Sequence, residues 1–138
     1  MDKERFSDKK AVEKQKGDLS GADLSHADLR DTDLSGADLR GANLSHADLR
    51  VANLHGANLS GANLSGVDLR NVDLTRVNFS GANLYNADLR GVSLDGAKLE
   101  GAKLEGAKLN NIDVIWVCDA CDTIHPSRDK MLACECGF

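Results

Sequence analysis

The sequence predicts an all-β fold in which the chain winds into a rod of stacked coils. Three observations predict it: a five-residue phrase recurs along most of the chain, leucine stands at the centre of almost every phrase, and arginines recur every twenty residues. Five residues of an α-helix turn through about 500°, so leucines five apart make no stripe on a helix. In a straight strand they would alternate between the two faces. The chain must therefore turn a corner once in every phrase.

Each phrase alternates apolar and polar residues before two turn-forming residues. If the central apolar residue is called position i, it falls at Leu19 and every fifth residue to Leu109, with Phe79 as the exception, and Val114 closes the series. Position i−2 is small or β-branched, and two apolar positions separated by a polar one are typical of a strand. Ser-Gly or Ser-His often follows and favours a turn. We predict a three-residue strand and a bend, with positions i and i−2 inward.

A longer period indicates how many phrases form one coil. Four phrases spaced by twenty residues carry both an aspartate at i−1 and an arginine at i+1: Asp28 and Arg30, Asp48 and Arg50, Asp68 and Arg70, Asp88 and Arg90. Four phrases per square coil would stack these pairs in one column, with coils about 4.8 Å apart. Duplication of a 20-residue gene segment would leave the same period. In a stacked column, the opposite charges should pair laterally and diagonally.

The A(D/N)LXX phrase resembles the pentapeptide repeat family over residues 17–116. The resemblance implies a right-handed quadrilateral parallel β-helix, here of about five coils, with leucine ladders inside and Asp or Asn at i−1 near the corners. Lys98, Lys103 and Lys108 depart from the pattern at i−1, and so does Ser93. The i−2 valines at positions 67, 72, 77 and 92 are expected to fill the centre of the third and fourth coils.

The same family includes proteins thought to imitate duplex DNA and bind DNA gyrase or topoisomerase. Duplex DNA carries one negative charge per ~1.7 Å, or about 14 over the ~24 Å of five coils. Residues 17–116 hold fourteen Asp or Glu and nine Lys or Arg, and 9 − 14 gives a net charge of −5. DNA mimicry is therefore less favoured than a solvated ladder that keeps the rod in register. Mimics of this type dimerise through their C-terminal ends, which here carry a cysteine tail, so we expect a monomer.

Residues 1–16 form a separate N-terminal segment with ten charged residues. Two predictions are open for it: a short helix whose Phe6 and Val12 face the first coil, or disorder. The segment has no apolar core typical of a secretory signal, and the chain has no apolar run long enough to span a membrane. We expect a cytoplasmic protein with reduced cysteines.

Residues 117–138 form a cysteine-rich tail. Its cysteines come as a C-x2-C pair and a C-x-C pair with twelve residues between them: Cys118, Cys121, Cys134 and Cys136. The tail resembles a small zinc ribbon, which implies a structural Zn²⁺ ion on these four thiolates and a metal-stabilised cap on the last coil. His125 could replace one cysteine, because the second pair is one residue short. Buried free thiols, disulfides and a redox C-x-x-C pair are the alternatives.

The faces of the rod offer few catalytic groups. His26 and His46 are predicted to share a column one coil apart, either as surface residues, which we favour, or as ligands of a shared metal, whereas His55 falls on another face. No Ser–His–acid arrangement stands out, so we expect no enzyme activity. The predicted function is a structural or protein-interaction module with an unknown protein partner. Gyrase regulation and nucleic-acid binding by the zinc ribbon are the alternatives, the second disfavoured because Arg128 and Lys130 are the tail's only basic residues.

Overall fold

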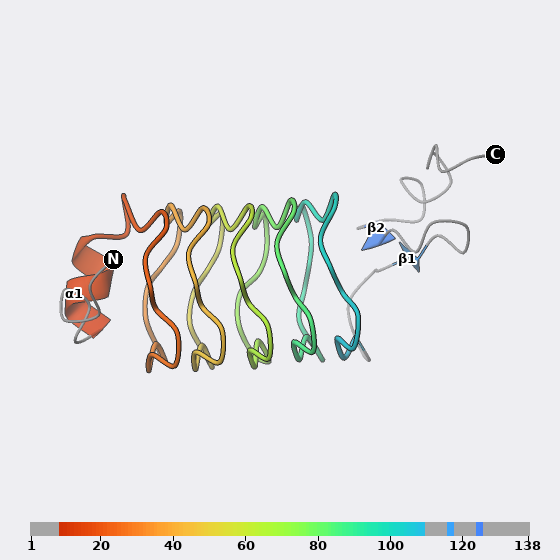
Figure 1. Cartoon of the computed structure of the whole chain (residues 1–138), viewed down its shortest axis with the longest axis horizontal. Helices are drawn as coiled ribbons and strands as arrows, with labels where there is room; N and C mark the ends of the chain where they lie inside the picture. Colours follow the sequence, from red (N-terminus) through yellow and green to blue (C-terminus); the bar gives the residue numbers. More distant parts are fainter. Residues whose placement is uncertain (1–8, 110–115, 118–123, 126–138) are drawn as a thin grey trace.

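The computed structural model describes residues 9–109, 116–117 and 124–125. Figure 1 shows helix α1 (Lys9–Lys14) at the N-terminal end of a rod of stacked coils. Strands β1 (Trp116–Val117) and β2 (Ile124–His125) follow in the sequence and pair antiparallel, with Trp116 opposite His125. No helix in this described part has the length and apolarity needed to cross a bilayer.

One circuit of the rod takes twenty residues. Parallel bridges join residues twenty apart, such as Asp28 with Asp48 and Asp48 with Asp68, so four phrases form one coil as predicted. The predicted three-residue strands are replaced by single-residue bridges at position i−1. The amide of Leu24 donates to the Asn43 carbonyl at 2.8 Å, and the amide of Asn43 donates to the Ala22 carbonyl at 2.8 Å. The corners on either side leave no length for a longer strand.

The core is a stack of identical layers. Position i is at most 4% exposed from Leu19 to Leu99, and Phe79 fits into the same ladder at 0%. The i−2 side chains fill the space between these leucines, including the four valines predicted there (Val67, Val72, Val77 and Val92, all at most 4% exposed). Burying one such leucine stabilises the fold by about 1.5–3 kcal/mol. The prediction that positions i and i−2 point inward is confirmed.

Every corner of the described coils has the same backbone conformation. The residue at i+2 has a positive φ at all eighteen corners, eleven of them glycine and seven not. The amide at i+3 donates to the carbonyl at i, as from Ala22 to Leu19 at 3.0 Å, which is the arrangement of a type II turn. A residue other than Gly, Asn or Asp is rare in this left-handed region, so the corner sequence is a strong constraint.

Helix α1 covers the first coil. Val12 is fully buried, and Phe6, which was also expected to face this coil, lies outside the described residues. Lys9 lies 3.7 Å from a carboxylate oxygen of Asp28. The Glu13 carboxylate accepts a hydrogen bond from the amide of Asp33 at 2.9 Å. The helix thus supplies the apolar contact and some of the polar partners that a preceding coil would give.

Candidate functional site

The Asp and Asn side chains at i−1 are structural groups that close the corners. The Asp23 carboxylate accepts hydrogen bonds from the amide and the hydroxyl of Ser25, at 3.1 and 2.6 Å. Asn43 does the same for Ser45, at 3.1 and 2.7 Å. A side-chain oxygen that accepts from the backbone two residues on is an Asx turn, which Asp and Asn form equally well. Acidic residues at these positions are therefore already engaged.

The Arg column consists of the four aspartates and four arginines spaced by twenty residues: Asp28, Asp48, Asp68, Asp88, Arg30, Arg50, Arg70 and Arg90. Each arginine holds the aspartate of its own phrase through two hydrogen bonds, as Arg30 holds Asp28 at 2.8 Å from both Nε and a terminal nitrogen. Two arginines also contact the aspartate of the next coil diagonally. Nε of Arg30 lies 3.6 Å from a carboxylate oxygen of Asp48, and Nε of Arg70 lies 3.4 Å from one of Asp88. The predicted lateral and diagonal pairing is confirmed.

The electrostatics of the Arg column keep its carboxylates ionised. The arginine hydrogen bonds are the largest cause that lowers the pKa of Asp48, Asp68 and Asp88 below the usual range, and burial opposes them. Hydrogen bonds to the charged form stabilise it, as does the adjacent guanidinium. Each negative charge is matched by a positive one in the same phrase. The column therefore presents paired charges, not an uninterrupted acidic strip.

Among the residues whose burial is described, two large apolar side chains point outward instead of into the core. Val51 is 60% exposed and Tyr85 is 52% exposed. Val51 immediately follows Arg50 at a corner, where its φ is +63°. Tyr85 belongs to the phrase before Arg90. The Arg column lies between the positions of these two side chains on the circuit.

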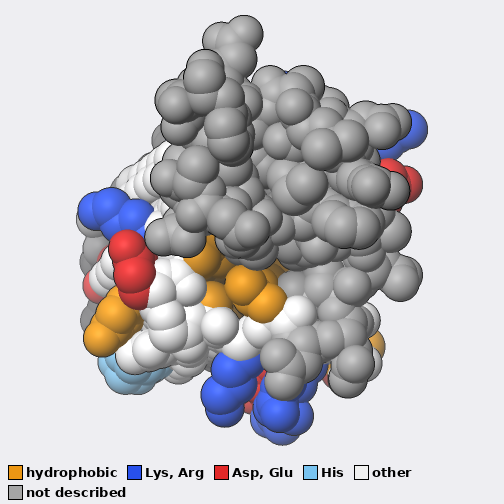
Figure 2. Space-filling view, turned by 90° about the vertical axis from the view of Figure 1, so that its right-hand side faces the viewer, with side chains coloured by type: hydrophobic (Ala, Val, Ile, Leu, Met, Phe, Trp, Pro, Cys, Tyr) orange, Lys and Arg blue, Asp and Glu red, His pale blue; other side chains and the backbone are white. Residues whose placement is uncertain are grey.

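The histidine pair is formed by His26 and His46, at the same corner of consecutive coils. Their rings stack with centroids 5.2 Å apart and planes at 20°. Figure 2 looks onto the C-terminal end of the rod and shows histidine side chains at one corner, beside the face where basic side chains gather. His55 lies on a different face, as predicted, with Nδ1 2.6 Å from the hydroxyl of Thr75.

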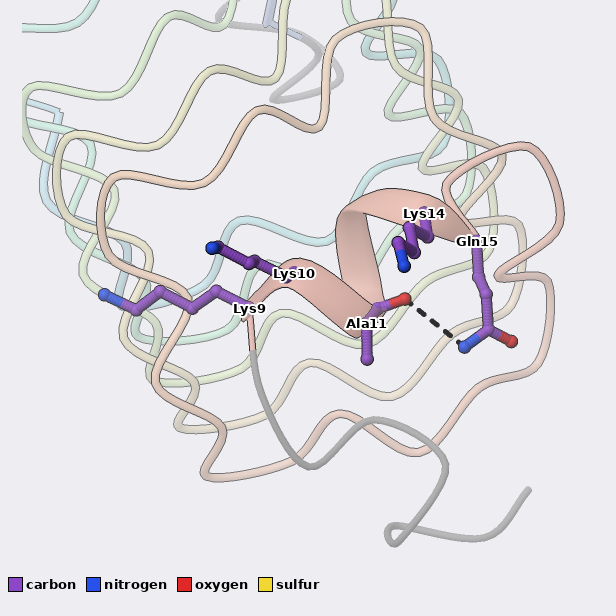
Figure 3. Close-up of a pocket in the computed structure, with 5 residues that line it drawn as sticks. All are labelled: Lys9, Lys10, Ala11, Lys14 and Gln15. Carbon is purple, nitrogen blue, oxygen red and sulfur yellow. Dashed lines mark hydrogen bonds between the residues drawn. The ribbon is translucent and has the colours of Figure 1, made fainter.

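An open depression beside α1 is lined by Lys9, Lys10, Ala11, Lys14 and Gln15. Figure 3 shows the side chains of Lys9 and Lys10 extending in the same direction and that of Lys14 lying apart from them, while the Gln15 amide donates to the Ala11 carbonyl at 3.3 Å. The lining has no carboxylate, hydroxyl or thiol to act as a base or nucleophile. This depression has none of the convergent groups of an active site.

The predicted zinc ligands Cys118, Cys121, Cys134 and Cys136 lie outside the described residues. His125, the alternative ligand, is the last residue of β2. Strands β1 and β2 pair on either side of the segment that holds the C-x2-C pair. Across the described ranges, no group of three or more His, Cys, Asp or Glu side chains is arranged to hold a metal ion.

Sequence reasoning missed Val51 as a functional candidate. The signal was present, because position i+2 is glycine in most phrases and the exceptions are mostly Asn, Asp or His. At the corners that the structure describes, Val51 and Arg76 are the two that are not. Tyr85 was missed too, although it replaces a residue that is mostly serine or arginine at i+1.

Comparison with known proteins identifies the repeat. A family model described as pentapeptide repeats matches in eight copies over residues 18–56, 52–91 and 73–111. A pentapeptide repeat protein from the thylakoid lumen of Arabidopsis thaliana is 30% identical with a TM-score of 0.67, over 84% of this chain and 88% of that one.

HetL, a pentapeptide repeat protein involved in the regulation of heterocyst differentiation in the cyanobacterium Nostoc sp. strain PCC 7120, is 31% identical with a TM-score of 0.63. The match covers 78% of this chain and 59% of HetL, so it spans less than two thirds of HetL. A search of curated proteins found no match. The repeat β-solenoid described above agrees with these structures, and the chain belongs to the pentapeptide repeat family.

Proposed function

We propose that this chain is a non-enzymatic protein-interaction module of the cytoplasm. It is a right-handed quadrilateral β-helix of about five coils that binds a protein partner through the face of the Arg column, and a zinc-stabilised tail caps its C-terminal end. The main observation behind the proposal is Val51, whose side chain is exposed and whose backbone is in the left-handed conformation. The involvement of HetL in a regulatory process is in line with a binding role.

Val51 is unfavourable for the isolated chain in two ways. A left-handed conformation costs a residue with a Cβ about 1–2 kcal/mol, and valine is among the least suited to it. With 60% of its surface exposed, Val51 recovers little of this through burial. The same corner of the next coil has Asn71, which suits the conformation. Strained residues of this kind cluster at sites of contact and switching, which motivates an external partner for Val51.

The surroundings of Val51 fit a protein interface. Arginine and aromatic residues are enriched at interface cores, and an apolar anchor rimmed by polar groups is the usual arrangement. Val51 lies on one side of the Arg column and Tyr85 on the other, so the face offers two apolar anchors with paired charges between them. Because each arginine is already paired, the face favours a partner with mixed charges over a polyanion.

The zinc-stabilised cap is a second part of the proposal. Four thiolates at C-x2-C and C-x-C spacing suit tetrahedral Zn²⁺, and the pairing of β1 with β2 around the first pair is in keeping with a zinc ribbon. A short tail lacks a core of its own, so bound metal would supply its folding energy. The test is metal content per chain on protein purified without chelator. One zinc with protected thiols is expected, whereas four reactive thiols or disulfides would refute the cap.

The interaction proposal is tested by crosslinking mass spectrometry in cells from which the gene comes. Wild-type bait and the variant Val51→Asn are compared, with Arg76→Asn as control because it introduces the same residue at a left-handed corner on another face. We expect a partner that crosslinks to the Arg column and is lost from Val51→Asn but kept by Arg76→Asn. Equal capture by all three would refute the assignment of this face. Inhibition of gyrase supercoiling that weakens with salt would instead support DNA mimicry.

A further inference from the structure

We propose that His26 and His46 form a two-imidazole binding site for a divalent late transition-metal ion, Ni²⁺ or Cu²⁺. The site lies at one corner of the rod's first coils, distant in sequence from the cysteine tail, and the inference does not depend on the proposed interaction face. It begins from the stacking of two rings that the fold brings to the same corner.

The backbone beneath both rings is fixed by the coil ladder. The amide of His26 donates to the Ser45 carbonyl at 3.0 Å, and the amide of His46 donates to the Ser65 carbonyl at 3.2 Å. Both histidines have nearly the same left-handed backbone, with φ of +61° and +59°. The two side chains therefore leave the rod in the same direction from neighbouring coils. The backbone beneath the two ligands therefore needs little ordering when an ion binds, and only the side chains have to rotate.

Glycine in the following coil leaves room for the pair. A Cβ at Gly66 would lie 2.8 Å from Cε1 of His46, so any other residue there would push the ring away. Asn86 occupies the same corner one coil further on. Residue 66, which follows His26 and His46 in this column, must therefore stay small. A larger side chain there would displace the ring of His46 from its stack with His26.

The ring nitrogens of the pair are available for coordination. In the part of the chain that the structure describes, neither ring has a hydrogen-bond partner, whereas His55 is held by Thr75 at 2.6 Å. Nearby hydroxyls are already used, since Ser25 and Ser45 donate to Asp23 and Asn43. Both histidines are exposed, so their rings can tilt toward a common ion.

The donor set determines which ion fits. A metal–imidazole bond is about 2.0–2.1 Å long and lies in the plane of the ring. The two rings, with centroids 5.2 Å apart and planes at 20°, must therefore rotate until one nitrogen of each points at the same ion. Nitrogen ligands with water at the remaining positions suit Cu²⁺ and Ni²⁺. A structural zinc site needs four protein ligands, and the described residues offer no third His, Cys, Asp or Glu here.

The experiment is an NMR titration of the full-length protein with NiCl₂ at pH 8, following the imidazole signals. Ni²⁺ is paramagnetic and broadens only nearby protons, so any binding to tail thiols is seen separately. We expect the signals of His26 and His46 to broaden together at the lowest Ni²⁺ concentration, with His55 unaffected. Broadening of His55 at the same concentration would overturn the site.

Two variants test whether both rings hold one ion. His26→Asn and His46→Asn keep a residue that tolerates the corner, as Asn86 does with φ of +59°. Each should raise the Ni²⁺ concentration needed to broaden the remaining ring about 100-fold, because the second ligand adds by chelation. His55→Asn is the control and should change nothing. If either single variant leaves the other ring's broadening unchanged, the two histidines do not share an ion.

Discussion

The backbone follows the same path at both ends of the rod, but the i−1 side chains are acidic at the N-terminal end and basic at the last described positions. In the first coil every i−1 position is aspartate (Asp18, Asp23, Asp28 and Asp33), whereas the last described positions are lysine (Lys98, Lys103 and Lys108). The first coil closes its corners with carboxylate oxygens and is covered by α1. The last coil has lysine, without an acceptor, at its three described i−1 positions, and its Leu104 and Leu109 are only partly buried. Figure 2 shows apolar atoms at this end.

Comparing the two ends separates the hydrogen bonds between coils from the Asx hydrogen bonds within a phrase. Elsewhere in the repeat the two kinds occur together. The bridges between coils continue through Lys103, whose amide donates to the Ala82 carbonyl at 2.9 Å. The Asx bonds within a phrase are missing there, because a lysine side chain has no acceptor. The coil path is therefore set by the leucine ladder and the bridges, and the i−1 side chain adds stability locally. The C-terminal coil should depend on the coil before it.

The largest effect should come from shortening a leucine at the centre compared with the end. Leu64→Ala removes a fully buried side chain and should lower the free energy of unfolding by about 3 kcal/mol, as for other core leucines. Leu104→Ala, in the same column at the end, should cost about 1 kcal/mol because the site is already partly open. Urea unfolding followed by circular dichroism measures both. Equal losses would mean that the end is as well packed as the centre.

Removing the helix contact should make the first coil resemble the last. Val12→Ala deletes two buried methyl groups and should cost about 1.6 kcal/mol, at about 0.8 kcal/mol per group. Amide hydrogen exchange should speed up first at Leu19 and Leu24. Lys10→Ala, on the exposed side of the same helix, is the control and should leave exchange unchanged. Uniform acceleration along the whole rod would instead indicate one cooperative unit without local ends.

Exchanging residues at one corner column tests the strain at Val51. Val51→Asn should raise the free energy of unfolding by about 1 kcal/mol, because asparagine tolerates the left-handed conformation. Asn71→Val, at the equivalent position one coil further on, should lower it by a similar amount. Thermal unfolding measures both changes. A loss of stability in Val51→Asn would show that the valine contributes to packing within the chain.

Adding the missing corner acceptor should stabilise the weak end. Lys103→Asn would give the amide of Glu105 the partner that the amide of Ser65 finds in Asn63 at 3.1 Å. A net gain of about 0.5–1 kcal/mol is typical of one such hydrogen bond. Asn63→Lys should lose the same amount at the centre. Slower hydrogen exchange at residue 105 in Lys103→Asn checks the gain, and no change there would mean that the Asx bond is not formed.

Much of this fold could be predicted from the sequence because one pattern repeats. The leucine period required a corner in every phrase, and the twenty-residue spacing of the Arg column predicted four phrases per coil and its ion pairs, both confirmed. Single-residue bridges replaced the predicted strands, since a period cannot show how much of each phrase remains extended. The zinc ligands Cys118, Cys121, Cys134 and Cys136 stay a prediction.

The candidate sites were harder to predict because they depend on side-chain directions. The sequence placed His26 and His46 in one column, but only the left-handed corner and the space above Gly66 bring their rings into a stack. Val51 was hidden for a related reason. The free-energy cost of a valine at this position arises from the left-handed backbone conformation at i+2, and the five-residue period alone does not specify that conformation.

The smallest expected effect concerns the ion pairs of the Arg column in acid. The pKa values of Asp68 and Asp88 are lowered in the folded chain, chiefly by the arginine hydrogen bonds. Their contribution is therefore fully present above the ordinary carboxyl pKa of about 4, and it is lost as pH falls through the lower, folded values. Arg70 contacts both aspartates, at 2.8 and 3.4 Å, whereas Arg40 contacts Asp38 alone among the described residues.

Arg70→Gln should therefore reduce thermal stability at pH 7 slightly more than Arg40→Gln, with both changes below those at Val51 because these arginines are exposed and screened by solvent. The gap between the two variants should narrow below pH 4 and in high salt, where the diagonal attraction weakens. Melting temperatures at pH 7 and pH 2, with and without 1 M NaCl, give the measurement. A gap that is unchanged both in acid and in 1 M NaCl would mean that Arg70 stabilises the rod by packing its side chain along the column, because an attraction between charges weakens in salt.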